Sequence, residues 1–262
     1  MKRLTSNFST AEKVVIPYIT PDYPVKGTTE LLIAGLERQG VRIIELGIPF
    51  SDPLADGPTI QQSSMVALAN GVNLDRVLEL ARWTYENTKI AVVLMGYVNP
   101  ILRMGTRLFF EKAAAANVQG LIIPDIPQDE AEPFLKLADE FGLAMIFLVA
   151  PTTRPERISK ISEASHLFSY CVSMNGVTGN QVLDAGFMKT TLNQVRQHHP
   201  KPFVVGFGIR SAQDVRAVLS EAKGAVIGSA LIKELGAETT AEKAAQRGLN
   251  WFAPLAGVAN EF

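Results

Sequence analysis

The stretch VRIIELGIPFSDPLADGPT, residues 41–59, contains both parts of the pattern that decides the fold. Its first part, 41–47, is an almost continuously apolar run, which is typical of a strand covered on both faces of a parallel sheet. A loop punctuated by Pro and Gly follows, and this loop carries Asp52 and Asp56. Glu45 lies inside the apolar run, where a carboxylate is costly to bury unless it is paired or protonated. The stretch therefore raises a functional question together with a structural one.

Short apolar runs of the same kind recur along the whole chain. There are eight: VVIPYIT (14–20), VRIIELG (41–47), IAVVLMG (90–96), GLIIPDI (120–126), LAMIFLVA (143–150), HLFSYCVS (166–173), PFVVGFG (202–208) and GAVIGSA (224–230). Stretches of helical period lie between them, and three of these stretches carry capping residues. The stretch 28–40 ends in Gly40, 129–142 ends in Gly142, and 211–224 begins at Ser211 and ends in Gly224.

This alternation of strands and helices, without a linker-like segment, predicts an α/β fold with one domain over residues 1–262. We expect a single (β/α)8 TIM barrel with an N-terminal extension and a short extra helix after the eighth strand. A doubly wound open sheet is the structural alternative. It usually has fewer strands, and its G-x-G-x-x-G signature does not follow the first run. In a barrel, active-site residues lie at the carboxyl ends of the strands or in the loops that follow them.

Composition excludes several classes of function. The chain has 262 residues, of which 47% are hydrophobic, so it can bury a large core. Lys and Arg number 25 and Asp and Glu 26, so no excess of positive charge attracts a nucleic acid. The one cysteine, Cys171, excludes an internal disulfide and fits a reducing compartment. No secretory h-region and no run of membrane-spanning length occurs, so a cytoplasmic protein without a membrane partner is expected.

A phosphate site is expected where the seventh and eighth predicted strands end. Gly206 and Gly208 end one strand, Gly228 and Ser229 end the next, and a short helical segment follows. Phosphate sites in these barrels use the loops after strands seven and eight, because glycines let backbone N–H groups approach an anion. GVTG (176–179) is a possible third contributor. Any single glycine is explained equally well by a turn, but two motifs at consecutive strand ends favour a small phosphorylated ligand.

Lysine, histidine and metal chemistry find little support in the sequence. A Schiff base needs a desolvated lysine at a strand end, and Lys26 stands at a helix start instead. The three histidines lie at a strand beginning and at a helix end, so no metal site and no Ser–His–Asp arrangement is expected.

Carboxylates therefore remain as the candidate catalytic groups. If Glu45 points into the pocket, desolvation raises its pKa toward the range of a general acid–base; alternatively it reaches outward to a partner on a helix. Asp52 and Asp56 precede Pro and Gly and are ordinarily turn formers, but Asp56 lies in a loop next to Glu45. Asp125, at the end of the fourth run, is either functional or satisfied by backbone amides.

Several motifs together resemble a known family. ELGIPFSDPLADGPTIQ (45–61) resembles the hallmark motif of the tryptophan synthase α subunit family. VLMGYVNPI (93–101), LIIPDIP (121–127), GVTG (176–179), GFGI (206–209) and IGSALIK (227–233) follow in the order and spacing of that family. The resemblance covers nearly the whole chain. It implies retro-aldol cleavage of indole-3-glycerol phosphate to indole and glyceraldehyde 3-phosphate. It also implies no cofactor in this chain and a pyridoxal-phosphate β subunit as partner in an αββα assembly.

The resemblance also implies roles for individual residues. Glu45 matches the catalytic acid–base, Asp56 the carboxylate that binds the indole N–H, and Tyr170 the active-site tyrosine. The positions that match phosphate-binding and loop-closing residues are Thr178, Gly179, Gly208, Gly228 and Ser229. Apolar residues at strand ends, Ile122, Phe147 and Leu148, are candidates to wall the indole ring.

Two departures from the family concern the first strand and its loop. TPDYP (20–24) stands where many members have a Gly-Asp-Pro turn, and Tyr18 stands where the family often has Phe. Both leave the pocket shape open. A phosphosugar isomerase or cyclase of a related barrel type is the alternative enzyme, but it usually needs a Lys, Cys or His at a strand end. A non-catalytic activating subunit is the other alternative, against which the intact Glu45 and Asp56 argue.

Overall fold

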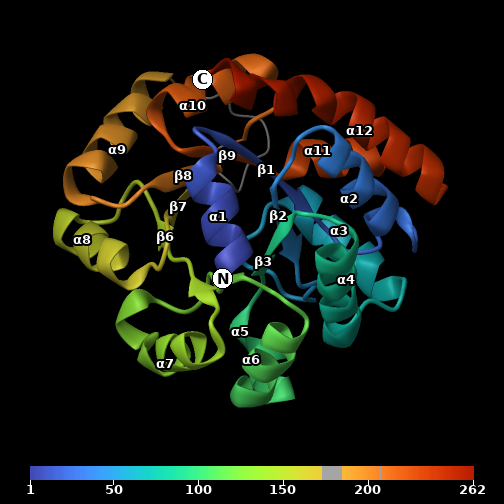
Figure 1. The fold of residues 1–262 in the computed structure, drawn as a ribbon, viewed down its shortest axis with the longest axis horizontal. Helices are drawn as coiled ribbons and strands as arrows, with labels where there is room; N and C mark the ends of the chain where they lie inside the picture. The colour runs from blue at the N-terminus through green and yellow to red at the C-terminus, as the bar shows by residue number, and fades with distance from the viewer. Residues whose placement is uncertain (173–184, 207) are drawn as a thin grey trace.

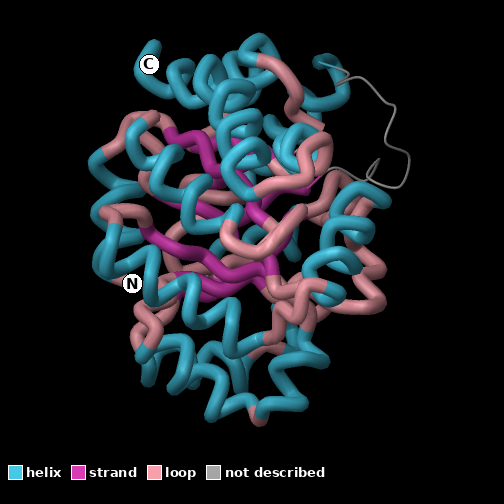
Figure 2. The backbone as a smooth tube through the Cα atoms, turned by 90° about the vertical axis from the view of Figure 1, so that its right-hand side faces the viewer, coloured by secondary structure: helices cyan, strands magenta, loops and turns pink. Residues whose placement is uncertain are grey.

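The computed structural model describes residues 1–172, 185–206 and 208–262. Its strands form one sheet in the order β5-β4-β3-β2-β1-β9-β8-β7-β6, and all the pairings are parallel. The strands are β1 (Val14–Ile19), β2 (Ile43–Gly47), β3 (Ala91–Met95), β4 (Gly120–Ile122), β5 (Ala144–Met145), β6 (Leu148–Val149), β7 (Ser169–Val172), β8 (Phe203–Gly206) and β9 (Gly224–Ile227). Figure 2 shows these strands in the middle of the molecule with helices outside them.

The sheet closes on itself through one segment. β5 and β6 are two halves of the run 143–150, which the sequence predicts as a single fifth strand. Between them the Ile146 N–H donates to the Leu121 carbonyl at 2.9 Å, and the Phe147 carbonyl accepts from the Tyr170 N–H at 2.9 Å. The same segment therefore pairs with β4 on one side and with β7 on the other. The predicted TIM barrel is confirmed, with its fifth strand interrupted.

Helices surround the barrel. They are α1 (Lys2–Thr10), α2 (Thr28–Arg38), α3 (Pro58–Ala69), α4 (Leu74–Asn87), α5 (Val98–Met104), α6 (Thr106–Ala115), α7 (Glu132–Phe141), α8 (Pro155–Ala164), α9 (Ala185–His198), α10 (Ala212–Glu221), α11 (Ser229–Leu235) and α12 (Ala241–Gly257), with 3-10 turns η1 (Gln128–Glu130) and η2 (Val258–Glu261). The predicted short extra helix is α11, directly after β9. In the part of the chain that the structure describes, no helix has the length and apolar character needed to cross a bilayer.

The helix ends follow the predicted capping residues with one exception. Ser211 begins α10 with a complete capping box, and Gly142 ends α7 in the left-handed conformation at φ 70°. Gly40, at φ 91°, follows the last residues of α2. Gly224 does not end a helix, because α10 already ends at Glu221 and Gly224 begins β9. A Cβ there would lie 2.7 Å from a Val14 methyl carbon, so close strand packing requires this glycine.

Two apolar layers result from the alternation of side chains along each strand. The larger cluster fills the space between strands and helices and includes Ile44, Leu46 and Phe147. The smaller cluster fills the barrel interior and includes Ile43 and Ile122. Glu45 lies between Ile44 and Leu46, so its side chain must point the opposite way, into the interior.

The N-terminal helix α1 closes one end of the barrel. Figure 1 shows α1 lying across the centre of the ring of helices. Its Leu4 and Phe8 belong to the interior cluster, and the Phe8 ring stacks on Phe168 with centroids 4.5 Å apart. The Leu4 N–H donates to the side-chain oxygen of Gln119 at 2.5 Å. The predicted N-terminal extension is thus a plug for the end opposite the carboxyl ends of the strands.

We expect Phe8→Ala to lower the free energy of unfolding by about 3 kcal/mol, because it empties a packed site in the interior. Urea unfolding followed by circular dichroism measures this change. Phe262→Ala is the matched control, since Phe262 is 41% exposed at the other terminus, and its effect should stay within about 0.5 kcal/mol. Equal losses from the two substitutions would contradict the role of α1 as a plug.

Candidate active site

Glu45 occupies the middle of β2 and faces the barrel interior. Its Cα neighbours are Tyr18 of β1 and Val93 of β3. The side chain is 2% exposed, and its Oε1 atom has no hydrogen-bond partner among the described residues. This placement excludes the alternative in which Glu45 reaches outward to a helix. A buried carboxyl group with an unpaired oxygen is available to a ligand.

Burial raises the pKa of Glu45 to about 8, and the negative charge of Asp56 contributes to the rise. The apolar interior disfavours the ionised carboxylate, and a second acid nearby disfavours it further. Glu45 therefore holds its proton through most of the neutral range. It can donate that proton to a substrate and accept one back, as a general acid–base must.

Asp56 lies in the loop between β2 and α3, and the backbone around it is anchored. The Asp56 N–H donates to the Pro53 carbonyl at 3.0 Å, and the Gln61 side chain donates to the Asp56 carbonyl at 2.9 Å. The Ala55 N–H donates to the Tyr97 hydroxyl oxygen at 2.9 Å. Burial raises the pKa of Asp56 to about 6, and a hydrogen bond from Tyr97 opposes part of that rise. At neutral pH, Asp56 is therefore mostly ionised while Glu45 is mostly neutral.

The other two acids of the predicted set have structural roles. Asp52 is exposed, and its carboxylate accepts the Ser51 hydroxyl at 2.5 Å. Asp125 is also exposed, and its two oxygens accept the Val98 N–H at 2.9 and 3.2 Å. That contact caps the first turn of α5, where an anion is favourable. The Val98 backbone amide thus satisfies Asp125, which agrees with the structural one of the two interpretations that the sequence leaves open.

Two tyrosines border the same space as the carboxylates. Burial is the main cause that raises the pKa of Tyr18 well above its usual value, and the negative charges of Asp56 and Glu45 add to the rise. Burial, Glu45 and Asp56 do the same for Tyr170. Both phenol oxygens lie where a Cβ would stand on a neighbouring strand, at Gly47 for Tyr18 and at Gly206 for Tyr170. Glycine at these positions makes room for the two rings at the carboxyl end of the barrel.

One predicted wall residue is misplaced. Ile122 and Leu148 belong to the interior cluster, whereas Phe147 belongs to the cluster between strands and helices. The prediction for Phe147 is wrong because successive side chains of an extended segment point to opposite faces. Met95, the Cα neighbour of Ile122, packs on the interior cluster and was missed. Val93 is the strand neighbour of Glu45, and counting two residues along β3 from Val93 leads to Met95.

The described part of the predicted phosphate region lies beside this space. Gly228 precedes α11, and the nearest atom to a Cβ there would be the Cβ of Tyr18 at 3.5 Å. Ser229 is the exposed first residue of that helix. Gly208 has φ 47°, with open space where a side chain would begin. Thr178 and Gly179 lie outside the described residues. Within the described ranges, no three His, Cys, Asp or Glu side chains converge in a way that could hold a metal ion.

Comparisons with known proteins show which family the chain resembles over its length. The sequence model of the family described as tryptophan synthase alpha chain matches residues 4–256. The tryptophan synthase alpha chain of Prosthecochloris aestuarii is 41% identical over 252 residues, covering 93% of this chain and 94% of that protein. That of Chlorobium chlorochromatii is 42% identical over 254 residues, covering 94% and 95%.

Solved structures are similar over the whole fold. The tryptophan synthase subunit alpha from Legionella pneumophila superposes with a TM-score of 0.91 at 32% identity, covering 100% of both chains. A chain of the tryptophan synthase complex from Pyrococcus furiosus gives a TM-score of 0.86 at 34% identity, covering 94% of this chain and 99% of that one.

Proposed function

This chain belongs to the tryptophan synthase alpha chain family, the lyases that cleave indole-3-glycerol phosphate to indole and glyceraldehyde 3-phosphate in tryptophan biosynthesis, and we propose that Glu45 and Asp56 divide the chemistry of that reaction. The observation that carries the proposal is the pair itself. A buried, mostly neutral carboxyl group on a rigid strand faces the same space as an ionised one on the following loop. Two carboxyl groups with separated pKa values can run acid and base chemistry near neutral pH.

In the proposed reaction Glu45 moves two protons. Its neutral form donates a proton to C3 of the indole ring, which forms the C3–H bond. The resulting carboxylate then takes the proton from the hydroxyl group on the adjacent glycerol carbon. As that proton leaves, the carbon–oxygen double bond of the aldehyde forms, the bond between the ring and the glycerol carbon breaks, and its electrons restore the indole. Glu45 ends in its starting protonation state, so one carboxyl group of intermediate pKa suffices.

Asp56 stabilises the charge that this step creates. Protonation of C3 places positive charge on the indole nitrogen. An ionised carboxylate that accepts the indole N–H would stabilise that charge more strongly in a desolvated site than in water. The ring would lie between the two acids, with Ile122 and Leu148 of the interior cluster as apolar contacts and Tyr170 at its edge. The interior position of these residues supports this arrangement.

The phosphate group of the substrate would bind at the loops after β8 and β9. Gly208, Gly228 and Ser229 are the described members of the proposed set, and Thr178 and Gly179 complete it. The helix start after Gly228 supports the assignment, because the first turn of a helix offers backbone N–H groups to an anion. The positive φ and the open space at Gly208 support it too, because they leave room for a ligand.

We propose that residues 1–262 form one cytoplasmic catalytic domain whose partner is a tryptophan synthase β subunit in an αββα assembly. The crystal structure of a tryptophan synthase complex from Pyrococcus furiosus supports the partnership. Proton transfer by Glu45 and charge stabilisation by Asp56 require no cofactor from this chain, and pyridoxal phosphate is expected in the β subunit.

Release of free indole from indole-3-glycerol phosphate tests the function directly. The chain by itself should release indole. A parallel reaction measures indole release after a β subunit is added. Failure of both reactions to release indole, combined with stimulation of the β subunit, would support the non-catalytic alternative. Isomerisation or cyclisation of another phosphosugar without indole release would support the isomerase or cyclase alternative.

The pH dependence of kcat/KM should be bell-shaped. Asp56 acts when ionised, so activity is lost as pH falls through about 6. Glu45 acts when protonated, so activity is lost as pH rises through about 8. Initial rates of indole release in buffers of constant ionic strength measure both limbs. If kcat/KM shows no alkaline limb between about pH 7 and 9, the protonated state assigned to Glu45 is contradicted.

A further inference from the structure

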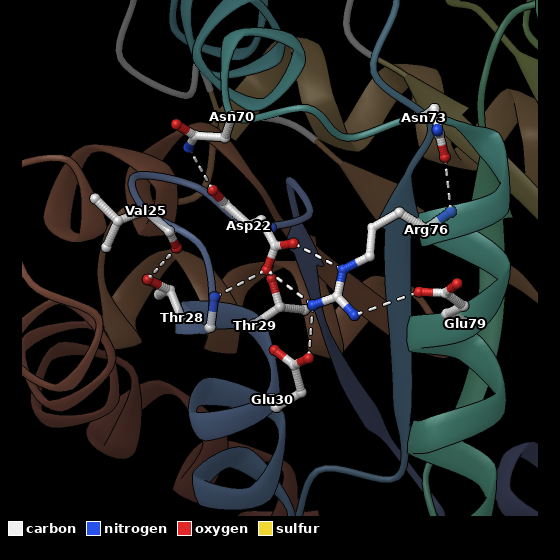
Figure 3. Close-up of polar contacts among 10 residues, drawn as sticks. Asp22, Val25, Thr28, Thr29, Glu30, Asn70, Asn73, Arg76 and Glu79 are labelled. Carbon is white, nitrogen blue, oxygen red and sulfur yellow. Dashed lines mark hydrogen bonds and ion pairs between the residues drawn. The ribbon is translucent and has the colours of Figure 1, made fainter.

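An ion pair between the buried Asp22 and the partly buried Arg76 fixes the loop that follows β1, at the same end of the barrel as the proposed site. Residues 20–27, here the β1–α2 loop, carry Asp22, whose side chain is 2% exposed. Its carboxylate accepts Arg76 Nε at 2.8 Å, Arg76 Nη2 at 3.3 Å and the Gly27 N–H at 3.1 Å (Figure 3). The Asp22 N–H donates to the Thr29 hydroxyl at 2.7 Å. The Asp22 carboxylate is therefore engaged by Arg76 of α4 and by the backbone just before α2, and its N–H by Thr29 of α2.

Arg76 is the cation among three acids. Figure 3 shows its guanidinium between Asp22, Glu30 and Glu79, which come from the loop, α2 and α4. Besides the contact with Asp22, Arg76 Nη2 lies 2.7 Å from Glu30, and Nη1 lies 3.7 Å from Glu79. A buried carboxylate that loses its only ion-pair partner among these groups is strongly destabilised. Asp22 also has φ 50°, a conformation that a residue other than glycine keeps only when its surroundings enforce it.

The β1–α2 loop in turn holds α3. The Asn70 side chain at the end of α3 donates to the carbonyls of Asp22 at 2.8 Å and Pro24 at 3.0 Å. Near the middle of α3, the buried Ser63 hydroxyl lies 2.8 Å from the Thr20 hydroxyl. These two connections fix α3 to the end of β1 at two separate points.

The elements connected in this way carry the proposed catalytic groups. Asp56 precedes the first residue of α3, Pro58, by two positions, and Tyr18 precedes Thr20 by two positions. The Tyr23 ring meanwhile packs on Gly236 at the end of α11, where a Cβ would collide with its hydroxyl. The loop is therefore in contact with α2, α3, α4 and α11 around the carboxyl ends of the strands.

We propose that Arg76 is a positioning residue for the lyase reaction. It neutralises and orients Asp22, which fixes the β1–α2 loop, and the loop fixes α3 and the preceding turn that holds Asp56. This proposal rests on the function proposed for Asp56. Arg76 itself touches neither Glu45 nor Asp56 in any described contact, so it acts through the loop.

The test compares Arg76→Met with Arg107→Met in the full chain, assayed for indole release across pH. Arg107 pairs with Glu140 on the exposed surface of α6 and α7, so it is a matched control for loss of a helical arginine in an ion pair. We expect Arg76→Met to lower kcat by about 10- to 100-fold with little change in KM, because small misplacements of catalytic groups have effects of this size. Arg107→Met should stay within twofold of the wild type, which is about the scatter of such assays.

The acid limb of the pH profile separates positioning from general loss of stability. Asp56 faces Glu45, Tyr18, Tyr97 and Tyr170, and its raised pKa depends on its burial there. If the loop and α3 relax, Asp56 becomes more hydrated and the acid limb moves to lower pH. Arg76→Lys, which keeps the charge but loses the forked contact, should fall between Arg76→Met and the wild type.

Asp22→Asn in the Arg76→Met background is the rescue variant. It removes the buried charge that needs a cation, so it should recover several-fold of the lost kcat if the unpaired carboxylate is the cause. A folded Arg76→Met protein with wild-type kcat and an unmoved acid limb would overturn the proposal. If Arg76→Met does not fold, a wild-type kcat and a wild-type acid limb in both Arg76→Lys and Asp22→Asn would overturn the proposal. An acid limb that persists in Asp56→Asn would instead refute the role of Asp56, while the loss and rescue of kcat still report on Arg76.

Discussion

Glu45→Gln should reduce indole release by about 100- to 10,000-fold, the range expected for loss of a general acid–base. Glutamine has nearly the same shape as glutamic acid but cannot donate a proton to indole C3 or take one from the glycerol hydroxyl. The measurement is single-turnover release of indole from indole-3-glycerol phosphate, which separates chemistry from product release. Substrate binding should change little. Near-normal turnover in the folded variant would refute the assignment.

The same substitution should stabilise the protein at alkaline pH. The pKa of Glu45 is raised from 4.5 to about 8 in the folded state, so the folded chain holds a proton that the unfolded chain releases. The contribution of Glu45 to the free energy of unfolding is therefore most favourable below pH 4.5 and becomes less favourable as pH rises toward 8. The loss is several kcal/mol, at most about 5. Glu45→Gln removes it, so urea unfolding at about pH 9 should favour the variant, while the difference shrinks near pH 5.

Asp56→Asn should reduce kcat by about 100- to 1,000-fold, as expected when one charge-stabilising group is lost from a desolvated site. The amide can still accept the indole N–H but cannot balance positive charge on the ring. Because the charge of Asp56 helps to raise the pKa of Glu45, the alkaline limb of the pH profile should also move to lower pH. Asp52→Asn is the matched control in the same loop, since Asp52 is exposed and bonds to Ser51. Equal effects from the two substitutions would contradict the distinction between a catalytic and a turn aspartate.

The barrel could be predicted because its signal is repeated and local. Each apolar run reports its own burial, and the order of runs and helical stretches leaves few topologies. The face of a single side chain is harder to predict, because the bounds of a strand set which residues point inward. Phe147, which the sequence places at the interior wall, faces the helices for this reason, while Leu148 beside it packs on the interior cluster. The sequence predicts a helix end at Gly224, because the close contact with Val14 that requires this glycine is invisible in the sequence.

Long-range polar contacts were beyond sequence reasoning. Asp22 and Arg76 are separated by 54 positions, and nothing in either local sequence indicates that they pair. The N-terminal plug is similar, because Leu4 and Phe8 show only two apolar positions in a short polar helix. Glu45 and Asp56 could be proposed from the sequence because Glu45 interrupts an apolar strand and Asp56 lies in the loop directly after it, so the local pattern itself contains the anomaly.

Glu45 should be a protonated acid at neutral pH, and a carbon-13 NMR titration of its carboxyl group measures its protonation state. Protein labelled in glutamate carboxyl carbons, compared with Glu45→Gln prepared in the same way, identifies the Glu45 signal by its absence in the variant. We expect this signal to titrate at about 8. A signal that titrates near 4.5, the ordinary value for glutamate, would contradict it.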